Sequence, residues 1–288
     1  MIDVLVVGAG PAGAIAALKL APAGARVLVL ERGRFPRQKL CGDTINPGAV
    51  CELELAGVAG HIRPLALPVS GMRVTGAGGV NVAGAYPEPL TGFSLQREVL
   101  DQTLADAARL AGARIEFGAR VVGPLVDERG RVVGVSVMCP SKREPVAITA
   151  PLTIAADGRR SSLAMRLGLA RHPRRRRWAV GAYFEGVGDL SAAGEMHVRG
   201  GEYLGIAPLP GGLANVCFVS SRRSGWKDPE GQLLHAIEAD PSTWRRFARA
   251  RRSSAVSVLG PLAVDAPVAG SPGLLLAGDA AGFIDPMT

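Results

Sequence analysis

Apolar residues in this chain form short unbroken runs and helical stripes. Residues 2–7 are almost all apolar, as in a parallel strand that is buried on both faces. A glycine-rich turn follows at 8–13, then a helix-forming stretch at 14–21 and a second apolar run at 27–30 that ends at Glu31. This order predicts a strand–turn–helix–strand unit of roughly 30 residues.

The same patterns predict elements along the rest of the chain. Asn46 before Pro47 is typical of a helix start. Residues 95–111 carry a helical apolar stripe, for which Ser94 is the expected N-cap. Further strands are predicted at 114–117, 121–126, 132–138, 152–155, 180–184, 195–198, 203–207, 214–219 and 274–277, and further helices at 232–238 and 242–250.

The runs typical of buried parallel strands lie near the start, in the middle and at the end of the chain. The sequence between them has the alternation of antiparallel strands. We therefore expect an α/β fold with two interleaved domains. The first is a discontinuous Rossmann-like domain of residues 1–69, 94–172 and 270–288. The second, of residues 70–93 and 173–269, is α+β with a mixed or antiparallel sheet.

Composition permits a sizeable core, since 48% of the residues are hydrophobic. The formal net charge is +8, with arginine runs at 171–177 and 245–252. Few aromatic residues interleave with these arginines and no nucleic-acid fold signature accompanies them, so we expect a solvated basic face and no nucleic-acid partner. The uncharged stretch 4–18 is too short and too interrupted by glycine and proline to cross a membrane.

Cysteines and histidines do not occur at the spacing of metal ligands. The four cysteines are widely separated without a C-x-x-C pair, and no two of the four histidines are at ligand spacing. We expect no metal site, no disulfide framework and no Ser-His-Asp hydrolase site, and a reduced protein in the cytoplasm.

The turn Gly8-x-Gly10-x-x-Gly13, which includes Pro11 and Ala12, has the pattern of a dinucleotide-binding fingerprint. Its first glycine permits the tight turn, the second lets the backbone approach a diphosphate, and the third lets helix and strand pack closely. Free N–H groups at the helix start then bind the diphosphate. The carboxylate at the end of the second strand, Glu31, is placed to accept hydrogen bonds from ribose hydroxyls.

Three further motifs accompany the glycine turn with Glu31-Arg32. They are Arg97-Glu98-Val99-Leu100-Asp101, Asp157-Gly158-Arg159-Arg160-Ser161-Ser162, and residues 275–286 with Gly278-Asp279 at their centre. Together these motifs resemble the FAD-dependent oxidoreductases of the p-hydroxybenzoate hydroxylase superfamily, which includes geranylgeranyl reductases and flavin halogenases. They run from the start of the sequence to its end, so the resemblance covers essentially the whole chain.

The resemblance implies further FAD contacts. Arg97 would lie near the flavin diphosphate, where a guanidinium neutralises phosphate. Asp157-Gly158 would shape the place where FAD and NAD(P)H meet, although Asp157 is also suited to cap the helix that follows. Asp279 would accept hydrogen bonds from ribityl hydroxyls, with Gly278 leaving room for the ligand. Pro286 would lie beside the isoalloxazine ring.

Lys39-Leu40-Cys41-Gly42-Asp43 resembles the Cys-Gly element of geranylgeranyl reductases. In that branch the cysteine faces flavin and substrate, so Cys41, Gly42 and Asp43 are expected on the substrate side, with Cys41 as the candidate catalytic residue. The alternative is that Cys41 is simply a small buried apolar residue.

The resemblance therefore implies an FAD-dependent oxidoreductase that uses NAD(P)H and acts on a small apolar, aromatic or prenyl substrate. We expect monooxygenase-type chemistry first, because it is commoner in the superfamily. The alternatives are geranylgeranyl-reductase-like reduction of prenyl C=C bonds and an incomplete or inactive FAD-binding fragment. The fragment is considered because relatives continue past the position of Thr288 with a helix at the flavin; without that helix we expect weak flavin binding.

Overall fold

The computed structural model describes residues 1–139, 144–174, 176–221 and 227–286. The chain forms two compact units, and each is assembled from segments that are distant in the sequence. The first unit comprises Met1–Arg37, Glu98–Arg174 and Ala263–Thr288; the second comprises Gln38–Arg97 and Arg175–Leu262.

A six-stranded sheet forms the centre of the first unit, in the order β19-β20-β12-β1-β2-β8. All its pairs are parallel except β19 with β20. A second sheet has the antiparallel order β11-β10-β9. The elements of the first unit are β1 (Val4–Val7), α1 (Pro11–Leu20), β2 (Val27–Glu31), α4 (Arg97–Leu110, its first residue in the second unit), β8 (Arg114–Phe117), β9 (Arg120–Val126), β10 (Val132–Met138), β11 (Val146–Thr149), β12 (Leu152–Ala155), α5 (Ser162–Arg166), β19 (Gly270–Ser271), β20 (Leu274–Leu276) and the 3₁₀ turn η4 (Gly278–Ala281).

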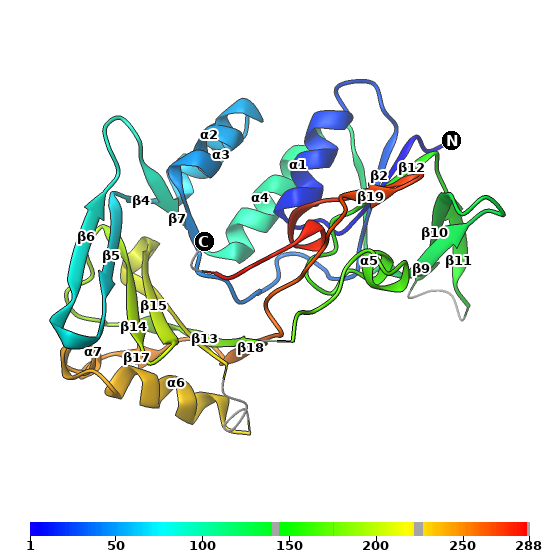
Figure 1. Ribbon diagram of the computed structural model, residues 1–288. Coiled ribbons are helices and arrows are strands. Elements are labelled where there is room, and N and C mark those ends of the chain that lie inside the picture. Colours follow the sequence, from blue (N-terminus) through cyan, green and yellow to red (C-terminus); the bar gives the residue numbers. More distant parts are fainter. Residues whose placement is uncertain (140–143, 175, 222–226, 287–288) are drawn as a thin grey trace. The chain divides into compact units, whose positions relative to one another are not determined.

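The parallel sheet is buried on both faces, which explains the unbroken apolar runs. Val4 and Val6 pack in a cluster with Ala17 of α1 and Ala108 of α4. Leu5 and Val7 point to the opposite face and share a core with the valines of β10. The unit is therefore a three-layer structure of helices, parallel sheet and antiparallel sheet (Figure 1).

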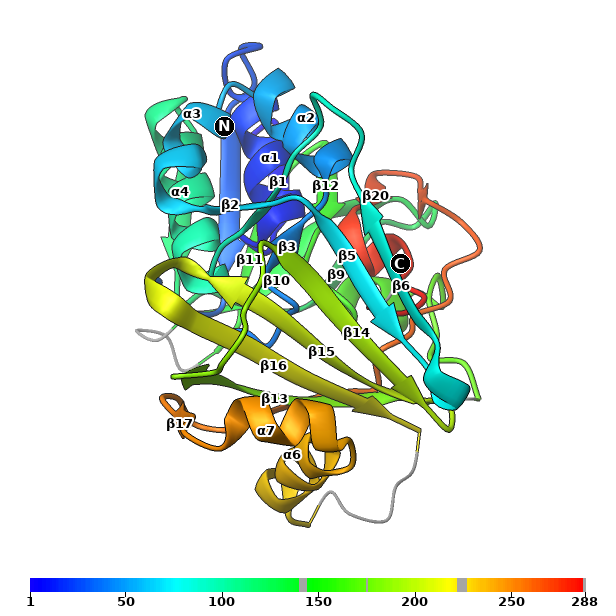
Figure 2. The same cartoon turned by 90° about the vertical axis from the view of Figure 1, so that its left-hand side faces the viewer.

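The second unit is built on an eight-stranded mixed sheet. Its strand order is β17-β13-β16-β15-β14-β5-β6, and β18 also pairs with β13. Helices α6 and α7 cover one face, with Leu233, Ile237 and Phe247 packed on the sheet (Figure 2). The elements are β3 (Thr44–Ile45), α2 (Pro47–Leu55), α3 (Ala59–Ile62), β4 (Leu67–Val69), β5 (Gly71–Thr75), β6 (Asn81–Ala85), β7 (Gly92–Ser94), β13 (Trp178–Glu185), β14 (Ala193–Arg199), β15 (Glu202–Leu209), β16 (Leu213–Ser220), α6 (Pro229–Glu238), α7 (Pro241–Phe247), β17 (Arg251–Arg252), β18 (Ser257–Leu259) and the 3₁₀ turns Arg63–Leu65, Ala77–Gly79 and Pro210–Gly212.

These layers are the predicted α/β architecture, with a Rossmann-like unit and a second unit that carries a mixed sheet. Asn46 caps α2 as predicted, since its side chain accepts a hydrogen bond from Ala49 N at 2.8 Å. The prediction that Ser94 caps the long helix is wrong. Ser94 is buried in β7, its hydroxyl donates to the Pro208 carbonyl, and the helix begins at Arg97.

The boundaries between the units differ from the predicted ones. Residues 38–69 and 94–97, expected in the first domain, belong to the second unit. Strands β3 and β4 both pair with β7, and these hydrogen bonds bind the loop after residue 37 to the second unit. Residues 263–269 join the first unit, where Val264 pairs with Phe283. Local sequence patterns carry no information on such long-range pairing.

Candidate functional site

The carboxyl ends of four neighbouring parallel strands meet at one edge of the first unit's sheet. Val7 pairs with Leu30 on one side and Ala155 on the other, and Ala155 pairs with Leu276. The glycine turn, Glu31, Asp157 and Gly278-Asp279 directly follow or end these strands. Four motifs that are far apart in the sequence are therefore brought to a single edge, where ligands bind in open α/β sheets.

The three glycines of the turn have different surroundings. Gly8 has a φ of +99°, and a Cβ there would lie 2.5 Å from the Ala156 carbonyl oxygen. A Cβ on Gly13 would overlap the Gly8 carbonyl oxygen. At Gly10 the nearest atom to such a Cβ is Nη2 of Arg37, 3.9 Å away. Gly8 and Gly13 are thus required by the fold, whereas Gly10 leaves an open approach to the backbone.

Helix α1 begins without a side-chain cap. Gly10 is its N-cap, Pro11 takes the first helical position, and the first turn has no acidic residue. The N–H groups of this turn therefore have no carboxylate from the helix itself, and the helix dipole adds partial positive charge. This end of α1 suits an anionic group such as a diphosphate.

Glu31 ties the end of β2 to the turn. Its carboxylate is 5% exposed and accepts hydrogen bonds from Ala9 N and Gly33 N, each at 2.8 Å. Each carboxylate oxygen has a second lone-pair site, so these bonds leave acceptor capacity for a ligand hydroxyl. The predicted contact of Glu31 with a ribose remains a prediction. The sequence analysis did not foresee its structural role, which is to accept hydrogen bonds from the backbone at Ala9 and Gly33.

Arg37 is a candidate ligand-binding residue that the sequence analysis missed. Its guanidinium lies 4.9 Å from the Phe35 ring centroid, and Nη2 lies 3.3 Å from Oδ2 of the buried Asp101. Nε lies 3.9 Å from Oε1 of Glu31. These contacts hold a positive charge beside Gly10. The clue in the sequence was Asp101, the acidic residue of the R-x-x-L-D element, which needs a buried cationic partner.

The N-cap of α5 is Ser161, whose hydroxyl accepts from Ala164 N at 3.1 Å, and Asp157, the predicted cap, adds a bond to the first residue of the helix. The Oδ2 atom of Asp157 accepts from the Ser162 N–H at 2.8 Å and the Ser162 hydroxyl at 3.2 Å. Burial raises the pKa of this carboxyl. Its other oxygen, Oδ1, is buried without a hydrogen-bond partner, and Gly158 next to it has a φ of +82°. Asp157 thus retains an acceptor that a ligand donor would satisfy.

Gly278 and Asp279 lie close to the first turn of α1. Gly278 has a φ of +60°, and a Cβ there would lie 2.8 Å from Cβ of Ala12. Burial and the nearby charges of Arg160 and Arg32 lower the pKa of Arg159, while Asp279 acts in the opposite direction. Arg32, Arg160 and Asp279 are therefore each near Arg159. This clustering concentrates positive charge at the same edge.

The C-terminal part of the motif is described as far as residue 286. Pro286 is exposed, and its predicted position beside a flavin ring stays a prediction. The last two residues, Met287 and Thr288, lie outside the described residues.

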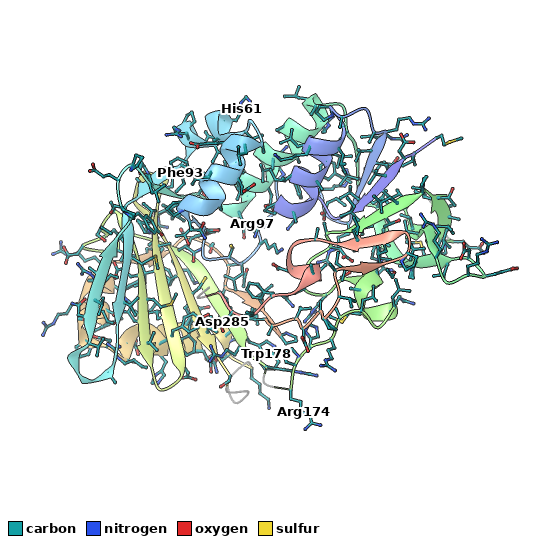
Figure 3. All side chains as sticks on the ribbon, turned by 45° about the horizontal axis from the view of Figure 1, so that its top comes forward. His61, Phe93, Arg97, Arg174, Trp178 and Asp285 are labelled. Atoms are coloured by element: carbon teal, nitrogen blue, oxygen red, sulfur yellow. The ribbon has the colours of Figure 1, made fainter. Side chains whose placement is uncertain are left out.

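A second cluster lies in the second unit, around Asp43. This residue is 2% exposed and has a φ of +56°. Asn215 Nδ2 donates to Asp43 Oδ2 at 2.6 Å and to the Cys41 carbonyl at 2.7 Å. The Arg97 N–H donates to Asp43 Oδ1 at 3.3 Å, so Asp43 holds the first residue of α4. Figure 3 labels Arg97 at this end of the helix. The predicted contact of the Arg97 side chain with a diphosphate stays a prediction.

The thiols of this cluster differ in surroundings. Cys41 is partly exposed, whereas burial raises the pKa of the Cys217 thiol well above its usual value. Cys217 Sγ lies 3.0 Å from Asn215 Oδ1 and 3.4 Å from the Cys41 carbonyl oxygen. The partial exposure of Cys41 is compatible with the predicted substrate-side role, which remains a prediction.

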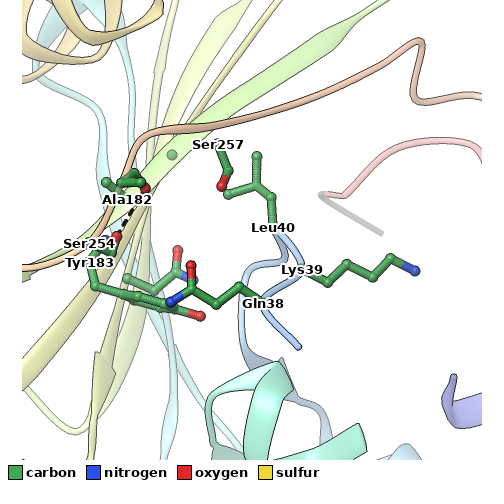
Figure 4. A pocket seen from close by; sticks show the side chains of 10 residues that line it. Gln38, Lys39, Leu40, Ala182, Tyr183, Ser254 and Ser257 are labelled. Carbon is green, nitrogen blue, oxygen red and sulfur yellow. Dashed lines mark hydrogen bonds between the residues drawn. The ribbon is translucent and has the colours of Figure 1, made fainter. Parts of the chain in front are cut away.

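A cavity borders this cluster (Figure 4). Tyr183 and Asn215 are on its wall, and Tyr183 N donates to Ser254 Oγ at 2.9 Å. A Cβ on Gly181 would lie 2.7 Å from Cδ1 of Leu40. Because Gly181 has no side chain, Leu40 can contact the sheet at this point. The cavity is lined by Gln38, Lys39, Leu40, Gly181, Ala182, Tyr183, Asn215, Ser254, Ala255 and Ser257.

The arginine runs take part in ion pairs. Arg246, Arg251 and Arg252 contact Glu195, Glu185 and Glu230 respectively. In the other run Arg171 pairs with Asp265, and residue 175 lies outside the described residues. Within the described part of the chain, no three His, Cys, Asp or Glu side chains are grouped as metal ligands. None of the described helices has both the length and the apolar character to cross a membrane.

Comparison with known proteins identifies similar chains. A family model described as "FAD binding domain" matches residues 1–250. The menaquinone reductase of Mycobacterium tuberculosis H37Rv is 32% identical over 311 residues, which cover 99% of this chain and 71% of the relative. Digeranylgeranylglycerophospholipid reductase 1 of Methanothermobacter thermautotrophicus is 30% identical over 303 residues, covering 100% and 72%.

Similarity in structure extends further than similarity in sequence. The myxobacterial chondrochloren halogenase CndH superposes with a TM-score of 0.91 at 23% identity, covering 99% of this chain and 69% of the halogenase. At this identity the match shows a common fold.

Proposed function

We propose that this protein reduces carbon–carbon double bonds of a prenyl chain. The chain belongs to the FAD binding domain family and is an FAD-dependent oxidoreductase. The observation that carries the proposal is the similarity to two reductases at 30–32% identity over almost the whole chain. Geranylgeranyl groups are prenyl chains, whose reducible groups are double bonds, and menaquinone carries such a chain beside its quinone. Reduction is therefore placed ahead of the monooxygenase-type chemistry expected first from the sequence.

The residues of the first unit fit FAD. The uncapped start of α1 and the open approach at Gly10 suit the diphosphate, and Arg37 would add a positive charge beside it. Glu31 retains acceptor capacity for ribose hydroxyls, and Asp279 lies at the same edge for ribityl hydroxyls. The unpartnered Oδ1 of Asp157 is a buried acceptor that a bound ligand would satisfy.

When bound and reduced, FAD supplies a hydride. The protein's part is to bind and orient the cofactor and substrate and to exclude water. NAD(P)H is our proposed source of the electrons. The Cys41-Gly42-Asp43 segment is proposed to lie on the substrate side, and Leu40 and Ala255 at the cavity beside it would be apolar contacts for the prenyl chain.

The proposal is tested by anaerobic incubation of the purified chain with excess FAD, dithionite and menaquinone, followed by exposure to air and mass spectrometry. Air reoxidises a reduced quinone ring, so a mass increase of two hydrogens that persists reports saturation of the prenyl chain. We expect this persistent increase. If every product returns to the starting mass, the prenyl reductase assignment is wrong and quinone reduction takes its place. Oxygen insertion in an aerobic reaction would instead support a monooxygenase.

A further inference from the structure

Asp43 is a buried carboxylate that accepts hydrogen bonds from three residues of the second unit, each in a different helix or strand. Asn215 on β16 donates at 2.6 Å, and the Arg97 N–H at the start of α4 donates at 3.3 Å. The Tyr183 hydroxyl on β13 is the third donor, and its hydrogen bond to Asp43 lowers the pKa of this carboxyl. A buried carboxylate without such donors would be very costly to ionise.

Tyr183 joins this carboxylate to the cavity. Its side chain hydrogen-bonds to Asp43, and the same residue forms part of the cavity wall. Asn215 also belongs to both, and it further contacts Cys217 and the Cys41 carbonyl. Tyr183 and Asn215 therefore connect a buried acid to the wall of the cavity.

The surroundings of Asp43 let this carboxyl keep its proton to a higher pH than an exposed aspartate does. Burial raises the pKa of Asp43 to about 6, although Asn215, Tyr183 and the charge and N–H of Arg97 favour the ionised form. The other titratable groups facing it are the thiols of Cys217 and Cys41. Burial and the Asp43 charge raise the pKa of Tyr183, so this phenol stays protonated at all working pH values.

We propose that Asp43 and Tyr183 form a proton relay that delivers a proton to a substrate double bond at the opening of this cavity. The inference rests on the proposed function. Saturation of a double bond needs a hydride at one carbon, whose two electrons come from reduced FAD, and a proton at the other. When Asp43 is protonated, its own O–H donates to the Tyr183 oxygen, and the Tyr183 O–H is then directed to the substrate. The Tyr183 O–H proton passes to that carbon while the Asp43 carboxylic acid proton passes to the Tyr183 oxygen. Asp43 is left as a carboxylate and regains a proton from water.

Proton delivery to the double bond requires both residues of the relay. Tyr183 alone would have to become a phenolate with a raised pKa, which makes it a poor acid. Asp43 is the stronger acid, but it is 2% exposed, and Tyr183 separates it from the cavity. In the relay, Asp43 provides the acidity and Tyr183 provides the access.

The relay predicts a characteristic pH profile for turnover. In the wild type, kcat should fall as the pH rises through about 6, the pKa of Asp43, because the acid must be protonated. Asp43→Asn should lower kcat by roughly 100-fold or more and remove this limb. Tyr183→Phe should lower kcat similarly. Asp106→Asn, an exposed carboxylate on α4, is the matched control and should keep the wild-type profile.

A second readout does not depend on turnover. In protein without flavin, labelled with ¹³C-carboxyl aspartate, the Asp43 signal is identified by its absence in Asp43→Asn. It should titrate near pH 6, and Tyr183→Phe should move its pKa upward, because one hydrogen bond to the carboxylate is lost. An Asp43 that titrates near 3.8 and does not respond to Tyr183→Phe would overturn the relay.

The outcomes separate the relay from the function on which it rests. If the wild type gives no prenyl reduction, the proposed function falls and the relay falls with it. If prenyl reduction occurs and both variants keep the wild-type rate and pH profile, only the relay is overturned. A loss of rate in Asp43→Asn with an unchanged basic limb would assign the residue a purely structural role and also overturn the relay.

Discussion

Arg246 on α7 binds the buried Glu195 of β14 through both guanidinium Nη atoms. Nη1 lies 2.6 Å from Oε2 and Nη2 lies 2.8 Å from Oε1. Glu195 also contacts His197 at 3.1 Å, and the other ring nitrogen of that histidine contacts the Thr75 hydroxyl at 2.9 Å. This network fastens α7 to the second unit's sheet across a stretch of 51 residues.

Loss of this arginine should destabilise the protein strongly. Arg246→Met leaves the Glu195 charge buried with fewer partners, and breaking a buried pair costs about 3–5 kcal/mol. The free energy of unfolding from urea titration measures the effect. Arg251→Met is the matched control, because Arg251 pairs with Glu185 at 2.6 Å but its side chain is 77% exposed. Its loss should cost less than about 1 kcal/mol, and equal effects of the two substitutions would contradict the prediction.

Gly10 should be required for FAD binding and dispensable for folding. A Cβ at this position has 3.9 Å to its nearest neighbour, so Gly10→Ala fits the fold. It would, however, occupy the space through which the diphosphate approaches the backbone. We expect an affinity for FAD at least about tenfold lower, measured by flavin fluorescence, with unchanged thermal unfolding without flavin. The control Gly60→Ala, where a Cβ meets no atom within 4 Å, should bind FAD normally.

Arg37 should contribute to FAD affinity through its charge. Hydrogen bonds to charged groups contribute about 1.5–3 kcal/mol, so Arg37→Met should weaken FAD binding by roughly tenfold or more. Arg37→Lys should recover part of this loss because it keeps the charge without the planar fork. The measurement is isothermal titration with FAD at two salt concentrations. Unchanged affinity in Arg37→Met would remove this residue from the candidate site.

Asp43 should make the wild type less stable as pH rises. Its folded pKa is about 6 against a usual value of 3.8, so the folded state holds the proton more tightly than the unfolded state. The stabilisation that this bound proton gives the folded state is complete below pH 3.8 and is lost as the pH rises through 6. The free energy of unfolding changes by about 3 kcal/mol over this range. Relative to Asp43→Asn, the wild type should therefore lose stability between pH 4 and about 6.5.

The measurement is urea unfolding of both proteins across this range. Glu195, whose pKa is lowered to about 2, loses its contribution as the pH falls below its usual value of 4.5. It titrates in both proteins, so the difference between them isolates Asp43. A difference that is independent of pH would contradict the raised pKa.

The sequence was sufficient for those parts of the fold that are encoded locally. The buried strands, the glycine turn with Glu31 and the Asn46 cap all follow from runs of a few residues, and their side-chain patterns are strong. Ser94 shows the limit of such patterns. A serine before a helical stripe suits an N-cap, but pairing of β7 with β3 and β4 buries it in a strand.

The candidate site was predictable where a motif contains the contacting residues. Arg37 was missed because its partners Glu31 and Asp101 come from different segments, and only the fold brings them together. The Asp43 cluster was anticipated only as a substrate-side segment. Its partner Asn215 is 172 residues away, and nothing in the sequence around Asn215 distinguishes it from other strand residues.

The two backbone hydrogen bonds to Glu31 have a consequence for how the cofactor associates. They hold Ala9 and Gly33 in place before any ligand arrives, so the loop loses little conformational entropy when it closes on a diphosphate. Backbone amide resonances of residues 8–13 and 31–33 should therefore shift on titration with FAD without a change in their picosecond-to-nanosecond order parameters. Glu31→Gln retains only one good acceptor oxygen, so it should hold Ala9 and Gly33 less firmly. The loop conformation that binds FAD would then be less populated, and FAD should associate more slowly.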